Sequence, residues 1–150
     1  MSKSSRWSEH RVRRRVQFHE TDAAGIVHFS CFFLYMEEAE HALWREAGLS
    51  IARGVAGVGF PRVAAAFEFH KPLRFEDEFD VSIRIAAIEE KTMRYACVLT
   101  RPDAAERIAT GTLTIICVSR GAGIPMKARA IPQDIVERFE VADEAGASGE

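Results

Sequence analysis

Asp22 lies in a turn-rich segment, residues 20–25, directly ahead of a long stretch with apolar residues at helical spacing. A carboxylate held near the amino-terminal end of a helix stays ionised. The same helix end presents free backbone N–H groups that can hold a developing oxyanion. Gly25, three residues after the aspartate, permits the positive φ that a bend aiming Asp22 would need. Without other context, an aspartate beside Thr21 and Gly25 is also typical of a plain turn.

Three further side chains near this segment are candidates, and each has a structural alternative. His28 either walls a substrate pocket or makes a structural hydrogen bond. Glu37 either orients water or the Asp22 loop, or is a solvated helix side chain. Cys31 follows His28 by three residues, but we expect a small buried residue rather than a nucleophile. No ligand spacing typical of a metal motif occurs among His19, Glu20, Asp22 and His28, so we predict no metal site.

Two elements must position Asp22: a strand predicted over residues 10–19 and a long helix predicted from Phe32 to Ala47. The helix is indicated by apolar residues at the i, i+3, i+4, i+7 spacing. Ser30 is its predicted N-cap and Gly48 its stop. The apolar residues are Phe32, Tyr35, Met36, Ala39, Leu43 and Ala47.

The second half of the chain changes to an alternating pattern, which is typical of strands. Before it, the glycines of residues 49–60 predict a short helical turn and a loop. The strands are expected over residues 63–69, 79–87, 93–99 and 107–119, with a short helix after Pro132. Short turns between these strands favour antiparallel neighbours. One long helix and one antiparallel sheet must bury each other, which gives an α+β architecture.

The composition excludes several classes of protein. The 150 residues are 47% hydrophobic and carry a net charge of −2, as one globular domain does. We expect that domain at residues 10–141, between flexible tails at 1–9 and 142–150. No membrane span or secretory signal is recognisable, and the three cysteines are widely spaced, so we expect a cytoplasmic protein with reduced thiols. The arginines of residues 11–15 alternate with apolar residues, which favours a solvated strand face over a nucleic-acid arm.

The segment from Phe18 to Ala39 resembles the signature of the 4-hydroxybenzoyl-CoA thioesterase-like family, in the branch of the Tol-Pal-associated acyl-CoA thioesterases. The matching positions are Phe18, Asp22, Gly25, Val27, Phe32, Glu37 and Ala39. Residues 72–77 and the order of the strands extend the resemblance over most of the chain. The family has the hotdog fold, so the resemblance implies a long central helix wrapped by a five-stranded antiparallel sheet. Where that branch carries Tyr-His, this chain has His28-Phe29, and no catalytic histidine is carried over.

The resemblance implies hydrolysis of an acyl-CoA thioester to a carboxylic acid and free CoA, with Asp22 as the nucleophile or as the base that activates water. By analogy, the Phe29 amide is the candidate oxyanion donor. No cofactor is implied, and relatives suggest a homo-oligomer, a dimer or a tetramer, with active sites at its interface. The expected catalytic residues are Asp22, Gly25, Phe29 and Glu37. The expected substrate-binding residues are His28, Phe32, Arg62, Lys71 and Arg74, with Lys127 as a further cation for the CoA phosphates.

Two alternative functions remain open at this point. The first is a non-catalytic hotdog protein that binds acyl-CoA or an aromatic ligand without turnover. The second is a hotdog hydratase or dehydratase. Such enzymes resemble one another in an active-site histidine that is paired with a carboxylate in a differently placed motif. That arrangement is absent from this sequence, which favours the thioesterase.

Overall fold

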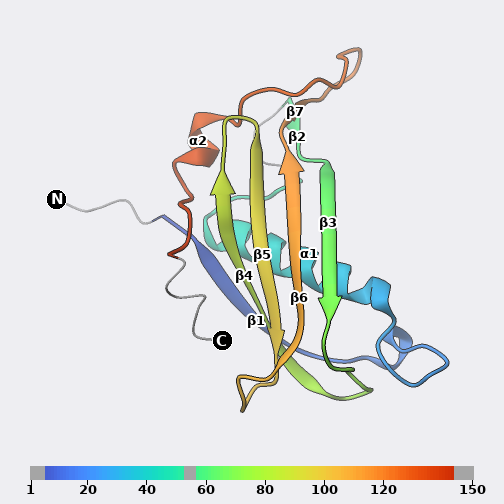
Figure 1. The fold of residues 1–150 in the computed structure, drawn as a ribbon. Coiled ribbons are helices and arrows are strands. Elements are labelled where there is room, and N and C mark those ends of the chain that lie inside the picture. The colour runs from blue at the N-terminus through green and yellow to red at the C-terminus, as the bar shows by residue number, and fades with distance from the viewer. Residues whose placement is uncertain (1–5, 53–56, 144–150) are drawn as a thin grey trace.

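One long helix, α1 (Phe29–Glu46), lies across one face of a five-stranded antiparallel sheet (Figure 1). The computed structural model describes residues 6–52 and 57–143. The sheet has the strand order β1-β4-β5-β6-β3, so β1 and β3 are its edges. The strands are β1 (Glu9–Arg15), β3 (Arg62–Phe69), β4 (Glu78–Ile88), β5 (Thr92–Thr100) and β6 (Arg107–Ile116). The predicted α+β class and hotdog arrangement are thereby confirmed.

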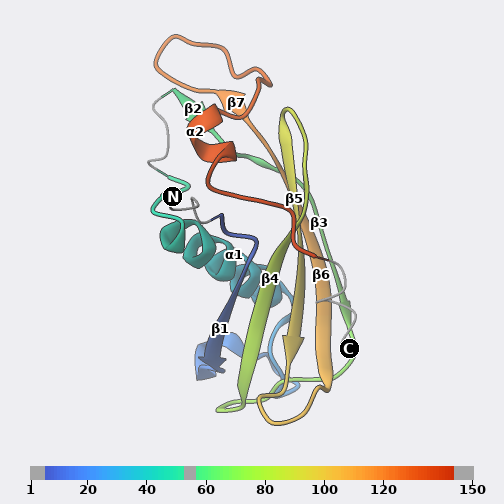
Figure 2. The ribbon, with the colours of Figure 1, turned by 90° about the vertical axis from the view of Figure 1, so that its left-hand side faces the viewer.

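The side view separates α1 from the curved sheet, whose edge strand β1 lies on the side of the helix (Figure 2). Helix α1 forms because its apolar residues recur on one stripe, and that stripe is buried against the sheet. The buried helix residues include Phe32, Tyr35, Met36, Ala39, Leu43 and Trp44. The helix ends at Glu46, and Gly48 follows with a φ of +81°, as the predicted stop requires.

Helix α1 begins three residues earlier than predicted, and its N-cap is His28 rather than Ser30. The Nδ1 atom of His28 accepts a hydrogen bond from the Ser30 backbone N–H at 3.2 Å and lies 2.8 Å from the Ser30 hydroxyl. The imidazole thus satisfies one of the free amides at the helix start. The extra turn places Phe29 at the first helical position.

The first strand is shorter than the predicted 10–19. It ends at Arg15, and residues Phe18–Glu20 form a 3₁₀ turn, η1. The chain leaves the strand because the Gln17 backbone N–H donates to the Glu20 carboxylate at 2.8 Å, which closes the turn. The alternation of apolar residues continues past the strand end, so periodicity alone could not locate this turn.

The predicted 107–119 strand divides at Cys117, whose N–H donates to the Lys91 carbonyl. Beyond it, β7 (Val118–Ser119) pairs with β2 (Val58–Gly59), a short strand inside the predicted loop. The helix expected after Pro132 is a single turn, α2 (Gln133–Val136).

The folded part of the chain extends further than the expected limits. Trp7 is hydrogen-bonded through both its backbone N–H and its carbonyl to the segment after α2, and Ala142 is 4% exposed. Both residues lie within the predicted flexible tails, but both are packed because their backbones are hydrogen-bonded to the domain. The outer parts of the expected tails, residues 1–5 and 144–150, lie outside the described residues.

Candidate active site

The loop that carries Asp22 is closed by its own backbone. Thr21 and Val27 form an antiparallel bridge, and the Asp22 N–H donates to the Ile26 carbonyl at 2.8 Å. Gly25 adopts a φ of +80°, and a Cβ added there would meet no atom within 4 Å. The glycine is therefore needed for its backbone conformation and not for space, as the sequence predicted.

One carboxylate oxygen of Asp22 is used within the loop. Its Oδ1 accepts the Ala24 N–H at 2.8 Å, which fixes the side chain in the turn. Among the described residues, Oδ2 has no hydrogen-bond or ion-pair partner. Asp22 as a whole is neither fully exposed nor buried.

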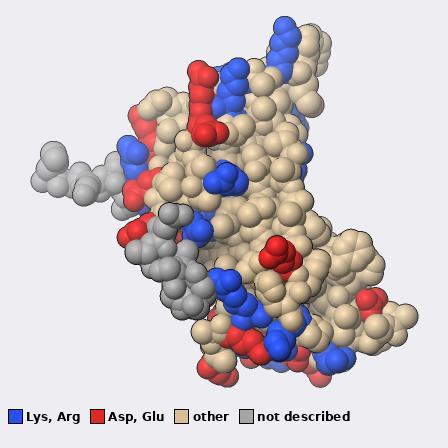
Figure 3. All heavy atoms as spheres, in the orientation of Figure 1, with Lys and Arg blue, Asp and Glu red and all other residues tan. Residues whose placement is uncertain are grey.

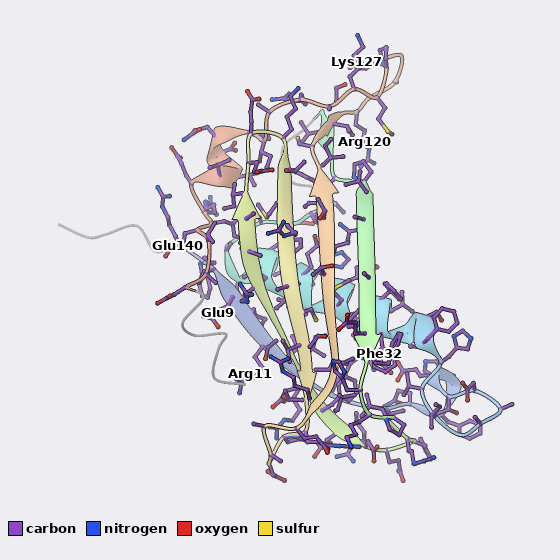
Figure 4. All side chains as sticks on the ribbon, in the orientation of Figure 1. Glu9, Arg11, Phe32, Arg120, Lys127 and Glu140 are labelled. Carbon is purple, nitrogen blue, oxygen red and sulfur yellow. The ribbon has the colours of Figure 1, made fainter. Side chains whose placement is uncertain are left out.

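Asp22 opens onto a pocket of about 380 Å³ at the N-terminal end of α1. The pocket is lined by Asp22, Ile26, Val27, Phe29, Phe32, Phe69, His70, Lys71, Pro72 and Leu73. Phe32, which lies beside the lower end of β3 in Figure 4, is 4% exposed, and its ring packs edge-on against Phe69 at 5.0 Å between centroids. The pocket combines one carboxylate with a mostly apolar wall.

Phe29 lines this pocket and is also the first residue of α1. As the first helical residue, it has an N–H with no acceptor inside the helix. The helix dipole adds partial positive charge at the same point. A negatively charged oxygen bound at this end of the helix would find a hydrogen-bond donor there.

The pocket brings together four of the predicted site residues, Asp22, Phe29, Phe32 and Lys71, and Gly25 shapes the loop beside them. The other predicted residues do not line it. His28 caps the helix and stacks on the Phe29 ring at 4.7 Å. Arg74 is exposed in the turn that follows the pocket residue Leu73. Lys127 lies at the opposite end of the molecule from Phe32 (Figure 4).

Glu37 and Arg62 belong to a separate cluster on the inner side of β3. Arg62 donates to Glu37 at 2.9 Å and to both carboxylate oxygens of Glu40, at 3.2 and 2.5 Å. The Glu40 side chain is fully buried, and burial raises the pKa of its carboxyl while Arg62 opposes that rise. Glu37 and Arg62 are thus engaged in ion pairs that connect α1 to the edge strand β3.

The sequence did not single out Phe69, His70 and Leu73, which also line the pocket. His70 is held by its Nε2 at 3.1 Å from the Thr110 hydroxyl and by its N–H to the Ile108 carbonyl. A usable signal was present, because these residues flank the predicted Lys71 at the end of a strand that Pro72 terminates. The missing information was that the Val27 N–H donates to the Leu73 carbonyl, which brings this segment to the Asp22 loop.

Within the described residues, no three His, Cys, Asp or Glu side chains gather as possible metal ligands. In the same part of the chain, no helix has the length and apolar character that crossing a membrane requires. Three of the four arginines of β1 have acidic partners. Arg13 pairs with Asp80, Arg14 with Glu20 and Glu38, and Arg15 with Glu78.

Residues 16–139 match the model of the Thioesterase-like superfamily. The chain belongs to this superfamily. The predicted family and thioesterase class are thereby confirmed.

Three relatives show how this thioesterase-like chain compares with known proteins. The crystal structure of a hypothetical protein from Aquifex aeolicus superposes with a TM-score of 0.79 at 31% identity, covering 87% of this chain and 99% of the other. A gentisyl-coenzyme A thioesterase superposes with a TM-score of 0.74 at 26% identity, covering 85% and 99%. The acyl-CoA thioester hydrolase YbgC of Escherichia coli O157:H7 is 23% identical over 127 residues, 84% of this chain and 92% of the relative.

Proposed function

We propose that this protein hydrolyses an acyl-CoA thioester to a carboxylic acid and free CoA in the pocket beside Asp22. The observation that carries the proposal is that one pocket is lined both by Asp22, whose Oδ2 has no partner among the described residues, and by Phe29, the first residue of α1. Membership of the Thioesterase-like superfamily supports the same reaction.

Two courses of the reaction fit this arrangement. In the first, Asp22 Oδ2 attacks the thioester carbon, the carbonyl oxygen takes up the negative charge, and the carbon–sulfur bond then breaks to give an anhydride that water hydrolyses. In the second, Asp22 takes a proton from a water molecule that attacks the same carbon. In both, the Phe29 N–H stabilises the oxyanion. The thiol, with a pKa of about 8.5, leaves as thiolate without a dedicated acid.

The remaining pocket residues are assigned to substrate binding. The rings of Phe32 and Phe69 form the apolar wall against which an acyl group packs. Lys71 at the pocket and the exposed Arg74 nearby are the cations we assign to the CoA phosphates. Arg62 is a weaker choice, because its guanidinium is already paired with two glutamates.

Thiol release from a panel of CoA thioesters tests the function. We expect the purified protein to release CoA from at least one member of a panel that spans acetyl-, octanoyl-, palmitoyl-, benzoyl- and gentisyl-CoA. Free carboxylic acid should form in equal amount. Tight binding of a panel member without thiol release would instead identify a non-catalytic binding protein.

We further propose that the protein is a homo-oligomer, a dimer or a tetramer, with active sites at its interface. The edge strand β3 supports this, because Val63 is 57% exposed and Ala64, Ala65 and Ala66 are exposed beside it. An unpaired apolar edge is unusual in a monomer. The outer face of the sheet also carries few charged side chains (Figure 3).

A charge placed on this edge is expected to dissociate the oligomer. Ala65→Lys should shift the mass in solution to that of a monomer and lower thiol release, because the active site would lose its partner. The matched control is Ala104→Lys, in the exposed turn between β5 and β6. Light scattering coupled to gel filtration measures the mass. A native protein of monomer mass, or an unchanged mass in Ala65→Lys, would contradict the assigned interface.

A further inference from the structure

Glu20 is a buried carboxylate two residues before Asp22, and the mechanism above does not use it. It is 6% exposed, although it lies in a short turn at the surface of the domain. A buried carboxylate is costly unless it is paired and hydrogen-bonded. The hydrogen-bond and ion-pair partners of Glu20 therefore indicate its role.

The Glu20 side chain joins three separate pieces of the fold. From β1, the Arg14 Nη1 lies 2.9 Å from Oε2. From the η1 turn, the Gln17 backbone N–H donates to Oε1 at 2.8 Å. From the buried face of α1, the Tyr35 hydroxyl donates to the same Oε1 at 2.9 Å.

These partners are themselves held in place. The Arg14 guanidinium lies over the Tyr35 ring, 4.7 Å from its centroid, and donates from Nε to Glu38 at 2.6 Å. Burial and the bond to Glu20 raise the pKa of the Tyr35 hydroxyl, so it remains a donor. The side chain of Glu20 is thus fixed from several directions.

The backbone of Glu20 holds the far end of the Asp22 loop. Its carbonyl accepts the His28 N–H at 2.8 Å, immediately before the helix begins. The hydrogen bond between the Glu20 carbonyl and the His28 N–H therefore closes the loop. Asp22 lies inside the closed loop, and Phe29 follows it directly. A displacement of Glu20 would move the carboxylate relative to the Phe29 amide.

We infer that Glu20 is a positioning residue, which fixes the Asp22 loop to β1 and α1 and so sets the Asp22 carboxylate against the Phe29 amide. The inference rests on the proposed function, because it assigns Glu20 a role in that reaction. Misplacement of a reacting group by about 1 Å can cost 100-fold in rate. The loss of this anchor should accordingly appear in kcat more than in KM.

The test compares Glu20→Gln with Asp80→Asn. Asp80 is a matched control, because it is 3% exposed and pairs with Arg13, another arginine of β1, but joins β1 to β4 away from the loop. Glu20→Gln should lower kcat about 10- to 100-fold with KM changed less than about threefold. Asp80→Asn should leave kcat within about twofold at a temperature where both variants are folded.

Two additional measurements keep the test decisive. If Glu20→Gln fails to fold, Tyr35→Phe tests the same anchor, because it removes the hydroxyl that donates to Glu20. Tyr35→Phe should lower kcat by a smaller factor, about two- to tenfold. Amide hydrogen exchange reads the loop without any substrate: Glu20→Gln should speed exchange of the Asp22 and His28 amides at least about tenfold, and Asp80→Asn should not.

Equal kcat values and equal exchange in Glu20→Gln and Asp80→Asn would overturn the inference. Its failure is distinguishable from failure of the proposed function. If the native protein hydrolyses CoA thioesters and Asp22→Asn abolishes this while Glu20→Gln does not slow it, only the positioning role is wrong. If the native protein hydrolyses none, the function is wrong, and the exchange measurement still decides whether Glu20 holds the loop.

Discussion

Asp22→Asn is expected to lower kcat for thioester hydrolysis by about 10²- to 10⁴-fold, the range typical of removing a positioned acid or base. Asparagine retains an oxygen that can accept the Ala24 N–H, so the loop should keep its shape. What is lost is the negative charge of a side chain that lines the pocket. Initial rates of thiol release at saturating acyl-CoA measure the effect.

The control for this change is Asp103→Asn, which neutralises an exposed carboxylate in the turn between β5 and β6. That variant should keep the native kcat. The melting temperature of both variants should stay close to that of the native protein. Full activity in Asp22→Asn would contradict the role of Asp22 and direct attention to His70, another polar residue of the pocket.

Arg62→Ala is expected to cause a large loss of stability, on the order of 3 kcal/mol, because it leaves the Glu40 carboxylate buried without its cation. For a domain of this size the melting temperature should fall by about 6–12 °C. Arg15→Ala removes an exposed ion pair with Glu78 and serves as the control. That change should cost no more than about 1 kcal/mol.

The loss in Arg62→Ala should also depend on pH. Burial already raises the pKa of Glu40, and Arg62 opposes the rise, so removing the arginine raises that pKa further. The folded variant then binds a proton that the unfolded chain releases. Its stability is therefore greatest at low pH and falls as pH rises through the folded pKa. Thermal unfolding at pH 5 and pH 8 should show the larger deficit at pH 8, and an equal deficit would contradict the assignment.

Much of the fold was predictable because it depends on periodicity. The helical spacing from Phe32 to Ala47 and the alternation in the later strands reflect burial on one face, and burial decides both elements. The ends of the helices and strands were less predictable. His28 caps α1 through a side-chain bond to Ser30, and the Glu20 carboxylate ends the first strand, and neither contact leaves a trace in apolar spacing.

The site was predictable where it is local in sequence. Asp22, Gly25 and Phe29 lie within one loop and one helix end, where the resemblance to the thioesterase family applies residue by residue, and Asp22 and Phe29 line one pocket. Residues that reach the pocket from a distant strand, such as His70, depend on strand pairing, which the sequence does not reveal. Arg62 illustrates the same limit. The sequence suggested a cation available for the CoA phosphates, whereas in the structure Arg62 is paired with buried Glu40.

A crystal structure of Asp22→Asn with an unhydrolysed acyl-CoA, chosen as the best substrate of the panel, tests the central claim most directly. We predict the thioester carbonyl oxygen within hydrogen-bond distance of the Phe29 N–H, with its carbon next to the Asn side chain at position 22. The acyl group should pack against Phe32 and Phe69. A thioester bound away from this pocket, or a carbonyl oxygen turned away from the Phe29 N–H, would contradict the proposed site.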